Sequence, residues 1–300
     1  MTHQPTGPVV YQVSHETTYR YRNDVSISHN LVHLKVRPCP RQTLVRDELT
    51  VSVPPAVRLT QTDYFGNPVT SFTIQEPHRT LSVRAVNVVE VHPDPAPDPA
   101  RTAPWEEVRR CLRTDRGAAT VDAYQFTFDS PYVKLDPGLY EYALPSFPAG
   151  RPVLEAVLDL THRIYTEFTF DSTATTIATP LTEVLRLKRG VCQDFAHFGI
   201  GCLRSFGLAA RYVSGYLQTM PPPGQARLVG ADASHAWLSV YCPRSGWTDV
   251  DPTNDVIPAH KHILVAWGRD YDDVSPVRGV ILGGGRHSLR VAVDVVRVDE

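Results

Sequence analysis

Residues 189–197 read Arg-Gly-Val-Cys-Gln-Asp-Phe-Ala-His, and they place Cys192 where a helix is expected to begin. An apolar stripe at helical spacing follows, formed by Phe195, Phe198, Cys202 and Phe206. This stripe predicts a helix over about 192–206, and Gly207 is a typical residue for its end. The first turn of a helix has unpaired N–H groups and the positive end of the dipole, which favour an anion. A thiol there ionises readily and can act as a nucleophile.

Two further polar residues follow Cys192 in an order that suits thiol chemistry. His235 stands at the start of a predicted strand, in Asp232-Ala-Ser-His-Ala-Trp237. Asp251 ends the next predicted strand, in Gly246-Trp-Thr-Asp-Val-Asp-Pro-Thr253. A lone histidine in a strand, or a lone aspartate at its end, is usually structural. Together with Cys192 they match a triad: the thiol attacks, the histidine takes and returns the proton, and the aspartate orients the imidazole.

Asp249 competes with Asp251 for the role of the orienting acid. Strand alternation places Asp249 and Asp251 on one face, so it does not distinguish them. A hairpin that pairs residue 235 with residue 251 has its turn centred on Pro243 and puts Asp249 opposite Trp237. Because Pro252 lacks the N–H that a central ladder needs, the returning strand is expected to end at Asp251. We therefore predict that Asp251 is the partner of His235.

The rest of the second half has a helical pattern first and a strand pattern afterwards. Helices are expected over 153–164, 181–187 and the segment that begins at Cys192. Strands are expected over 211–217, 235–242, 247–251 and 289–298. Helices followed by strands in sequence are typical of an α+β domain in which helices pack on an antiparallel sheet.

The first 92 residues alternate apolar and polar positions, separated by turn signals. The runs lie over 11–21, 32–36, 49–53 and 81–85, which predicts a β-rich domain of the sandwich or barrel type. Alternating prolines over 93–99 predict a semi-rigid linker, and a short helix is expected over 105–113. The predicted organisation is a β-rich N-terminal domain over 1–92, a Pro-rich linker and connecting segment over 93–150, and a catalytic domain over 151–300.

Composition excludes some classes of partner. The chain has 300 residues, 30 Lys plus Arg, 32 Asp plus Glu and a formal net charge of −2, which argues against a dedicated binder of nucleic acid or of anionic membranes. The N-terminus shows no basic and apolar leader pattern, so a cytoplasmic location is expected. The five cysteines include no Cys-x-x-Cys pair, which argues against a thiolate zinc site.

These motifs resemble the core of the transglutaminase-like superfamily, which shares the papain-like arrangement. The matching stretches are 189–197, Gly207-Leu-Ala-Ala-Arg-Tyr-Val-Ser-Gly-Tyr216, His235-Ala-Trp237, Gly246-Trp247 and Asp251-Pro-Thr253. Residues 8–85 also resemble the β-rich N-terminal region of bacterial members. The resemblance implies Cys192 as nucleophile, His235 as base and Asp251 as orienting acid, in acyl transfer on amides without a cofactor. A peptide or protein is the implied substrate, and the β-rich domain is a candidate surface for self-association.

Several neighbouring residues are secondary candidates. Gln193 and Trp237 are candidate oxyanion or substrate contacts, and Asp194 is expected to complement the helix N-terminus. The other candidates have structural interpretations. His197 and Cys202 are expected in the core, Gly283–Gly285 in a turn, and Arg186, Lys188 and Arg189 on a solvated helix end. His260 and His262 form only half a metal site, because no further ligands follow at metal-binding spacing. Three functions stay open: hydrolysis, which is favoured, transfer to an amine, and non-catalytic binding.

Overall fold

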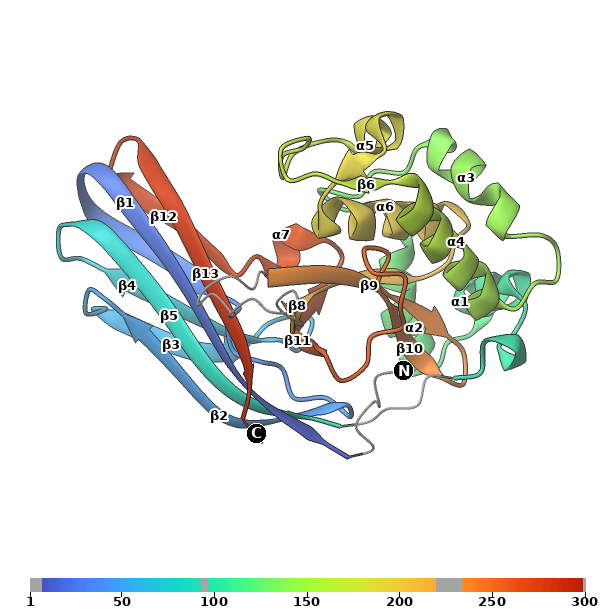
Figure 1. The fold of residues 1–300 in the computed structure, drawn as a ribbon, viewed down its shortest axis with the longest axis horizontal. Coiled ribbons are helices and arrows are strands. Elements are labelled where there is room, and N and C mark those ends of the chain that lie inside the picture. Colours follow the sequence, from blue (N-terminus) through green and yellow to red (C-terminus); the bar gives the residue numbers. More distant parts are fainter. Residues whose placement is uncertain (1–6, 93–96, 220–233, 299–300) are drawn as a thin grey trace, which may run out of the picture.

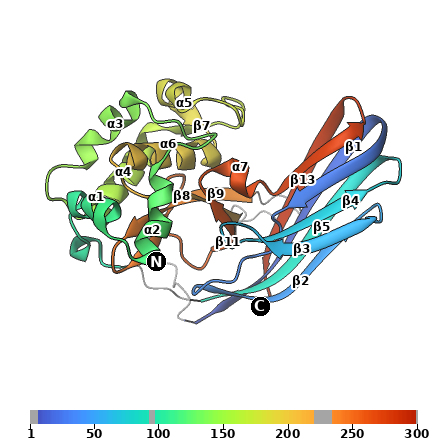
Figure 2. The same cartoon turned by 180° about the vertical axis from the view of Figure 1, so that it is seen from behind.

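The computed structural model describes residues 7–92, 97–219 and 234–298. It has two lobes that lie side by side, one built of long strands and the other of helices packed on a small sheet (Figure 1). We call them the β lobe (9–91 and 277–297) and the α+β lobe (97–274). Seen from behind, the same two lobes meet along the side where β11 faces the β lobe (Figure 2).

The β lobe is one antiparallel sheet in which four strands pair with a single long strand, β1. Its strands are β1 (Val9–Val32), β2 (Gln42–Val51), β3 (Val57–Thr62), β4 (Pro68–Ile74), β5 (His78–Val91), β12 (Val277–Gly283) and β13 (His287–Arg297). The order is β2-β5-β1-β4-β3, with β12 and β13 both paired to β1. Alternate residues of β1 are buried, which confirms the strand pattern seen from Tyr11 to Tyr21. The expected strand at 32–36 is wrong, since β1 ends at Val32.

The last two strands correct the predicted domain boundary. β13 pairs residue by residue with the first half of β1, from Tyr11 opposite Arg297 to Tyr21 opposite His287, and β12 pairs with its second half. The strand expected over 289–298 therefore belongs to the β lobe, and the boundary 151–300 is wrong at its C-terminal end. Alternation identified a strand there, but it carries no information about which sheet the strand joins.

The α+β lobe confirms the predicted fold class. Its helices are α1 (Trp105–Thr114), α2 (Ala118–Tyr124), α3 (Pro137–Ala143), α4 (Val153–Glu167), α5 (Leu181–Leu187), α6 (Cys192–Ser205) and the short α7 (Tyr271–Val274). Its antiparallel sheet has the order β10-β9-β8-β11, built from β8 (Ala210–Leu217), β9 (Ser234–Cys242), β10 (Gly246–Val250) and β11 (His262–Gly268). Two short strands, β6 (Thr169–Phe170) and β7 (Arg189–Gly190), pair in parallel. Within the described ranges, no helix combines the length and apolarity needed to cross a membrane.

The segment predicted as a connection is part of this lobe. Helices α1, α2 and α3 contribute buried side chains to the same hydrophobic cluster as α4 and α6, among them Leu112 of α1, Ala123 of α2 and Leu139 of α3. Residues 114–150, which have no clear periodicity in the sequence, form two helices and three-residue 3₁₀ turns. Pro93 to Ala96, where most of the linker was expected, lie outside the described residues.

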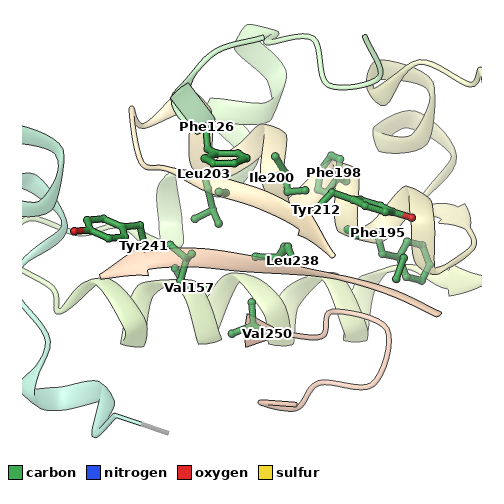
Figure 3. Packing of buried hydrophobic residues seen from close by; sticks show 14 of the residues in the cluster. Phe126, Val157, Phe195, Phe198, Ile200, Leu203, Tyr212, Leu238, Tyr241 and Val250 are labelled. Carbon is green, nitrogen blue, oxygen red and sulfur yellow. The ribbon is translucent and has the colours of Figure 1, made fainter. Parts of the chain in front are cut away.

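Helix α6 packs directly on β9, and this contact sets the position of the candidate nucleophile. Most of the labelled side chains of the cluster in Figure 3 come from α6 and from strands β8 to β10, and Val157 comes from α4. Gly199 faces Leu238 so closely that a Cβ at Gly199 would lie 2.5 Å from a Leu238 methyl group. A Cβ at this position would require the buried Leu238 side chain to move. The close approach therefore holds the N-terminus of α6 near the first residues of β9.

Candidate active site

Cys192 is the first residue of α6, as the sequence predicted. Asp194 turns back to accept the backbone N–H of Val191 at 2.8 Å and the hydroxyl of Thr175 at 2.7 Å. This confirms Asp194 as a residue that completes the helix N-terminus. A Cβ at Gly190 would lie 2.5 Å from the Asp194 carboxylate, so glycine is required immediately before the turn. Burial raises the pKa of Asp194, while the bonds from Thr175 and Val191 oppose that rise.

His235 and Asp251 meet across the end of the sheet. His235 is the second residue of β9, and Asp251 follows β10 in an isolated bridge with Val256. The Nε2 atom of His235 lies 2.7 Å from Oδ2 of Asp251. The Cys192 side chain lies close enough to the same imidazole to influence its pKa. Because Nε2 faces the carboxylate, Nδ1 is the nitrogen left for the thiol. The three residues singled out in the sequence are thus brought together.

The hairpin that joins β9 and β10 has a different register from the predicted one. Asp249 lies opposite Ser239 and Val250 opposite Leu238, so the turn is centred on Arg244 and not on Pro243. Arg244 has a φ of 73° and Gly246 one of 77°, a left-handed turn that the sequence analysis did not anticipate. The shift is two residues, and side chains in strands alternate with period two. Asp251 therefore stays on the face of His235.

The Asp251 carboxylate is fully buried and held by four donors. Besides His235, its Oδ2 atom accepts from Nε2 of His262 at 2.9 Å and from the side-chain amide of Asn254 at 2.7 Å. Its Oδ1 atom accepts the backbone N–H of Thr253 at 2.9 Å. Burial by itself would raise the pKa of Asp251, but the hydrogen bonds and charges of His235 and His262 hold it well below its usual range.

Asp251 and Cys192 together change the basicity of His235. Burial by itself would lower the pKa of His235, but the bonds to Asp251 and Cys192, and the negative charges of both, raise it to about 10. The protonated imidazole is therefore favoured beside the thiol near neutral pH. Imidazolium next to the N-terminus of α6 is an environment that favours thiolate.

His262 and Asn254 were not expected in this cluster. The sequence analysis considered His262 only with His260, as half a metal site. Residues 263–267 form an apolar run of five, which is the signal of a buried strand that would have placed His262 at a strand start. His235, Asp251 and His262 offer three ligand atoms within 4.8 Å of one another. However, both Nε2 atoms donate to the same oxygen, so these imidazoles are held by hydrogen bonds in the structure.

Trp237 does not occupy the role predicted for it. Its ring is fully buried and its indole N–H donates to Asp249 at 3.1 Å, so it lies beneath the site and is not free to contact an oxyanion. The ring packs against His235 and His262, with centroids 5.9 and 5.3 Å apart. Gln193 is half-buried next to Cys192 on the first turn of α6, and its role stays a prediction.

The other secondary candidates are structural. His197 is buried against Tyr132, accepts the backbone N–H of Tyr271 and has its pKa lowered to about 3 by burial. Cys202 is buried in the core as predicted. Arg186, Lys188 and Arg189 form ion pairs with exposed or partly exposed carboxylates. Gly283, Gly284 and Gly285 all have positive φ, which confirms the predicted turn.

Comparison with known proteins defines the family. A family model for the bacterial transglutaminase-like N-terminal region matches residues 11–90, and one for the transglutaminase-like superfamily matches residues 147–252. An uncharacterised protein of Mycobacterium tuberculosis is 44% identical over 300 residues, covering 97% of this chain and 94% of its own. The chain belongs to the transglutaminase-like superfamily.

The chain is also similar to one solved structure and, over a short stretch, to one enzyme. A crystal structure from Cytophaga hutchinsonii, described as a candidate cysteine protease, superposes with a TM-score of 0.76 at 22% identity, covering 98% of this chain and 92% of its own. This likeness shows that the two proteins share the same fold over both lobes. A protein-glutamine gamma-glutamyltransferase of Pseudomonas aeruginosa is 38% identical over 72 residues, which are 24% of this chain and 11% of that enzyme.

Proposed function

We propose that this protein cleaves amide bonds through a thioester formed on Cys192, with His235 as the base and Asp251 as the orienting acid. The observation that carries the proposal is the fully buried Asp251 carboxylate, fixed by four donors, which directs His235 toward a half-buried thiol at a helix N-terminus. Membership of the superfamily supports the general class of this chemistry.

The first half of the reaction is acylation. The Cys192 sulfur forms a bond to the amide carbonyl carbon, and the C–N bond breaks. His235 holds the proton that leaves the thiol and delivers it to the departing nitrogen, so an amine is released. Asp251 keeps the imidazole in one orientation and stabilises its charged form. The backbone N–H of Cys192, with Gln193 as the candidate second donor, would hold the negative charge on the carbonyl oxygen.

The second half of the reaction, in which an acceptor attacks the thioester, determines the type of activity. Water attacking the thioester gives a free acid and makes the protein a cysteine peptidase or amidase, which we favour. A primary amine attacking it gives a new amide and makes the protein a transglutaminase, and the match to the Pseudomonas glutamyltransferase favours this second candidate. Both outcomes use the same three residues, because the acceptor is selected by water exclusion and by amine binding.

One experiment separates these outcomes. The full chain is incubated with a peptide library and a labelled primary amine, and the products are read by mass spectrometry. Cleaved or deamidated peptides support hydrolysis, and peptides that gain the amine support transfer. The matched control is Cys192→Ala, which removes only the sulfur. Turnover that persists in this variant contradicts the proposed role of Cys192. The absence of turnover in the parent protein with every peptide and amine contradicts the proposal and leaves a non-catalytic binding role.

A further inference from the structure

A large pocket lies between the two lobes, on the same face of the small sheet as the His235–Asp251 pair. Its volume is about 750 Å³, within the range of small-molecule sites. Trp247, Asp249 and Arg211 come to it from the sheet of the α+β lobe, and Arg37 and Arg41 from the β lobe. Trp237 separates it from the candidate active site, because its ring packs on His235 while its N–H binds Asp249. The pocket is therefore a second site.

Alternating cations and indoles form one wall of this pocket. The Arg211 guanidinium lies 4.2 Å from the ring centroid of Trp247 and 3.7 Å from that of Trp267. The Arg37 guanidinium lies 3.5 Å from the Trp267 centroid. The two indole rings pack against the two faces of the Arg211 guanidinium and fix its orientation. Its N–H groups lie around the edge of the guanidinium plane, away from the rings. This is an oriented set of donors.

Arg211 has no hydrogen-bond acceptor among the described residues. It is 7% exposed, and its Nε atom is buried without a hydrogen-bond partner among those residues. The carboxylate beside it, Asp249, is already bound by Arg41 at 3.2 Å and by the Trp237 indole N–H. Burial lowers the pKa of Arg211 to about 9, which still leaves it charged at neutral pH.

A second buried arginine shows how unusual this is. Arg204 is 2% exposed, and its guanidinium donates to the carbonyls of Ala210, Phe128 and Arg269 and to the hydroxyl of Ser130. Buried charged groups in proteins are normally satisfied in this way. The contrast indicates that the Arg211 guanidinium is available to a bound ligand.

We propose that this pocket binds a small organic monocarboxylate with an apolar or aromatic body. Among the described residues that line the pocket, three arginines, Arg37, Arg41 and Arg211, stand against two aspartates, Asp122 and Asp249, so cations are in excess there. A carboxylate matches the planar fork of Arg211 with two parallel N–H bonds. The apolar body would lie against the ring-lined wall, which includes Phe65, Phe126, Trp247 and Trp267. This inference goes beyond the proposed catalytic function and does not depend on it.

The test uses phenylacetate as the probe and the neutral isostere phenylacetamide as its control. Binding to the full chain is followed by calorimetry and by the shift of the melting temperature. Phenylacetate and the aliphatic acid hexanoate are expected to bind saturably at millimolar concentrations or below, and phenylacetamide at least ~10-fold more weakly, since it lacks the charge that Arg211 requires. The absence of saturable binding by either acid, or equal binding of the amide, overturns the proposal.

Variants assign the binding to Arg211. Arg211→Met keeps an apolar chain between the indoles and removes the donors, so binding of phenylacetate is expected to fall at least ~10-fold. The melting temperature without ligand should be unchanged or higher, because a buried cation without a hydrogen-bond partner is removed. Arg46→Met is the matched control, since Arg46 is 71% exposed on the β lobe. Parent-like binding by Arg211→Met overturns the proposal.

Two further variants keep the result decisive. If Arg211→Met does not fold, Arg211→Lys retains the charge without the planar fork, and parent-like affinity in that variant equally contradicts the proposed geometry. Cys192→Ala separates this site from the catalytic one, because binding of phenylacetate is expected to be unchanged when the thiol is absent. Loss of binding in Cys192→Ala would place the acid at the candidate active site and overturn the second site.

Discussion

At the scale of single residues, the five cysteines differ in what surrounds them. Cys202 and Cys242 are buried, and burial raises the pKa of both, that of Cys242 to about 12. Burial also raises the pKa of Cys39. Cys192 is half-buried at the start of α6, and its side chain influences the pKa of His235. A protonated imidazole and a helix N-terminus both favour thiolate.

We therefore predict that Cys192 is alkylated faster than the other four thiols at pH 6 to 7. The measurement is peptide mapping after brief treatment with iodoacetamide across a pH series. His235→Gln is the matched control and should slow the reaction of Cys192 at acidic pH, because the cation beside the sulfur is lost. Faster modification of Cys111 or any other cysteine would show that the thiol is not activated.

Asp249 and Asp251 lie on one face but bind different partners. Asp251 accepts from His235 and His262, whereas Asp249 accepts from Trp237 and forms an ion pair with Arg41 of the β lobe. Asp251→Asn should therefore lower kcat strongly, up to the ~10⁴ known for serine triads and less for a thiol that ionises more easily. Asp249→Asn should mainly lower stability, by about 1–3 kcal/mol, because it weakens a partly buried ion pair.

Steady-state kinetics and thermal denaturation of both variants check this pair of expectations. The reverse pattern, an inactive Asp249→Asn beside a fully active Asp251→Asn, would transfer the orienting role to Asp249. Asp251→Asn should also flatten the acid limb of the stability curve. The folded pKa of Asp251 is depressed, so its contribution is present above the unfolded value of ~3.9 and is lost as the pH falls toward the folded value.

The cluster of His235, Asp251 and His262 also leads to a prediction about metals. Both imidazoles donate to the carboxylate oxygen that a cation would need, and Asn254 donates to it as well. Treatment with EDTA is therefore expected to leave turnover unchanged within about twofold, since the proposed thiol chemistry needs no Lewis acid. Activity that is lost to EDTA and restored by calcium or zinc would contradict this expectation.

At the scale of elements, the site depends on how closely three strands approach one another. Gly215 of β8 pairs with His235 of β9 and lies beside β11. A Cβ at Gly215 would lie 2.2 Å from the backbone oxygen of Ile263 and 2.4 Å from the Trp237 ring. The backbone oxygen has no rotamer by which to move aside, so the strands themselves would have to separate.

We predict that Gly215→Ala destabilises the protein by more than about 3 kcal/mol and lowers kcat in whatever fraction folds, because His235 is displaced. Urea denaturation and initial rates are the measurements. Gly7→Ala is the matched control, since a Cβ at Gly7 would meet nothing within 4 Å. Parent-like stability of Gly215→Ala would show that β8 and β11 can move apart freely.

At the scale of the whole molecule, the two lobes share one hydrophobic cluster. Val9, Tyr11 and Val293 of the β lobe belong to the same cluster as Phe198 of α6. Polar bonds also cross the boundary: the Gln42 amide donates to the carbonyl of Leu264 at 2.6 Å and accepts its N–H at 2.9 Å. The two lobes therefore form a single folding unit rather than two independent domains.

The segment 151–300 is accordingly expected not to fold when it is produced alone. It lacks α1 to α3, which fill the core, and it leaves β12 and β13 without the strand β1 that pairs with them. Circular dichroism and heat denaturation, with the full chain as reference, provide the measurement. A cooperative melt of the fragment would restore the predicted boundary at residue 151.

The sequence by itself determined those features that depend on neighbours along the chain. Apolar periodicity located α4, α5, α6 and the strands β8 to β10, and the position of Cys192 at a helix start follows from a local pattern. Motif order brought His235 and Asp251 into consideration before any contact was known. The superfamily was also recognisable from these motifs, and the comparisons confirm it.

Only the tertiary structure decided which distant segments meet. Alternation of apolar and polar residues does not specify which strands pair or in which register. The pairing of β13 with β1 and the two-residue shift of the β9–β10 hairpin could therefore not be predicted from it. His262 joins Asp251 because β11 runs beside β8. The Nε atom of Arg211 is buried without a partner in the described part of the chain because of how the two lobes pack around it. Burial and partner contacts are properties of the folded chain, and they set the charges on which both proposed sites depend.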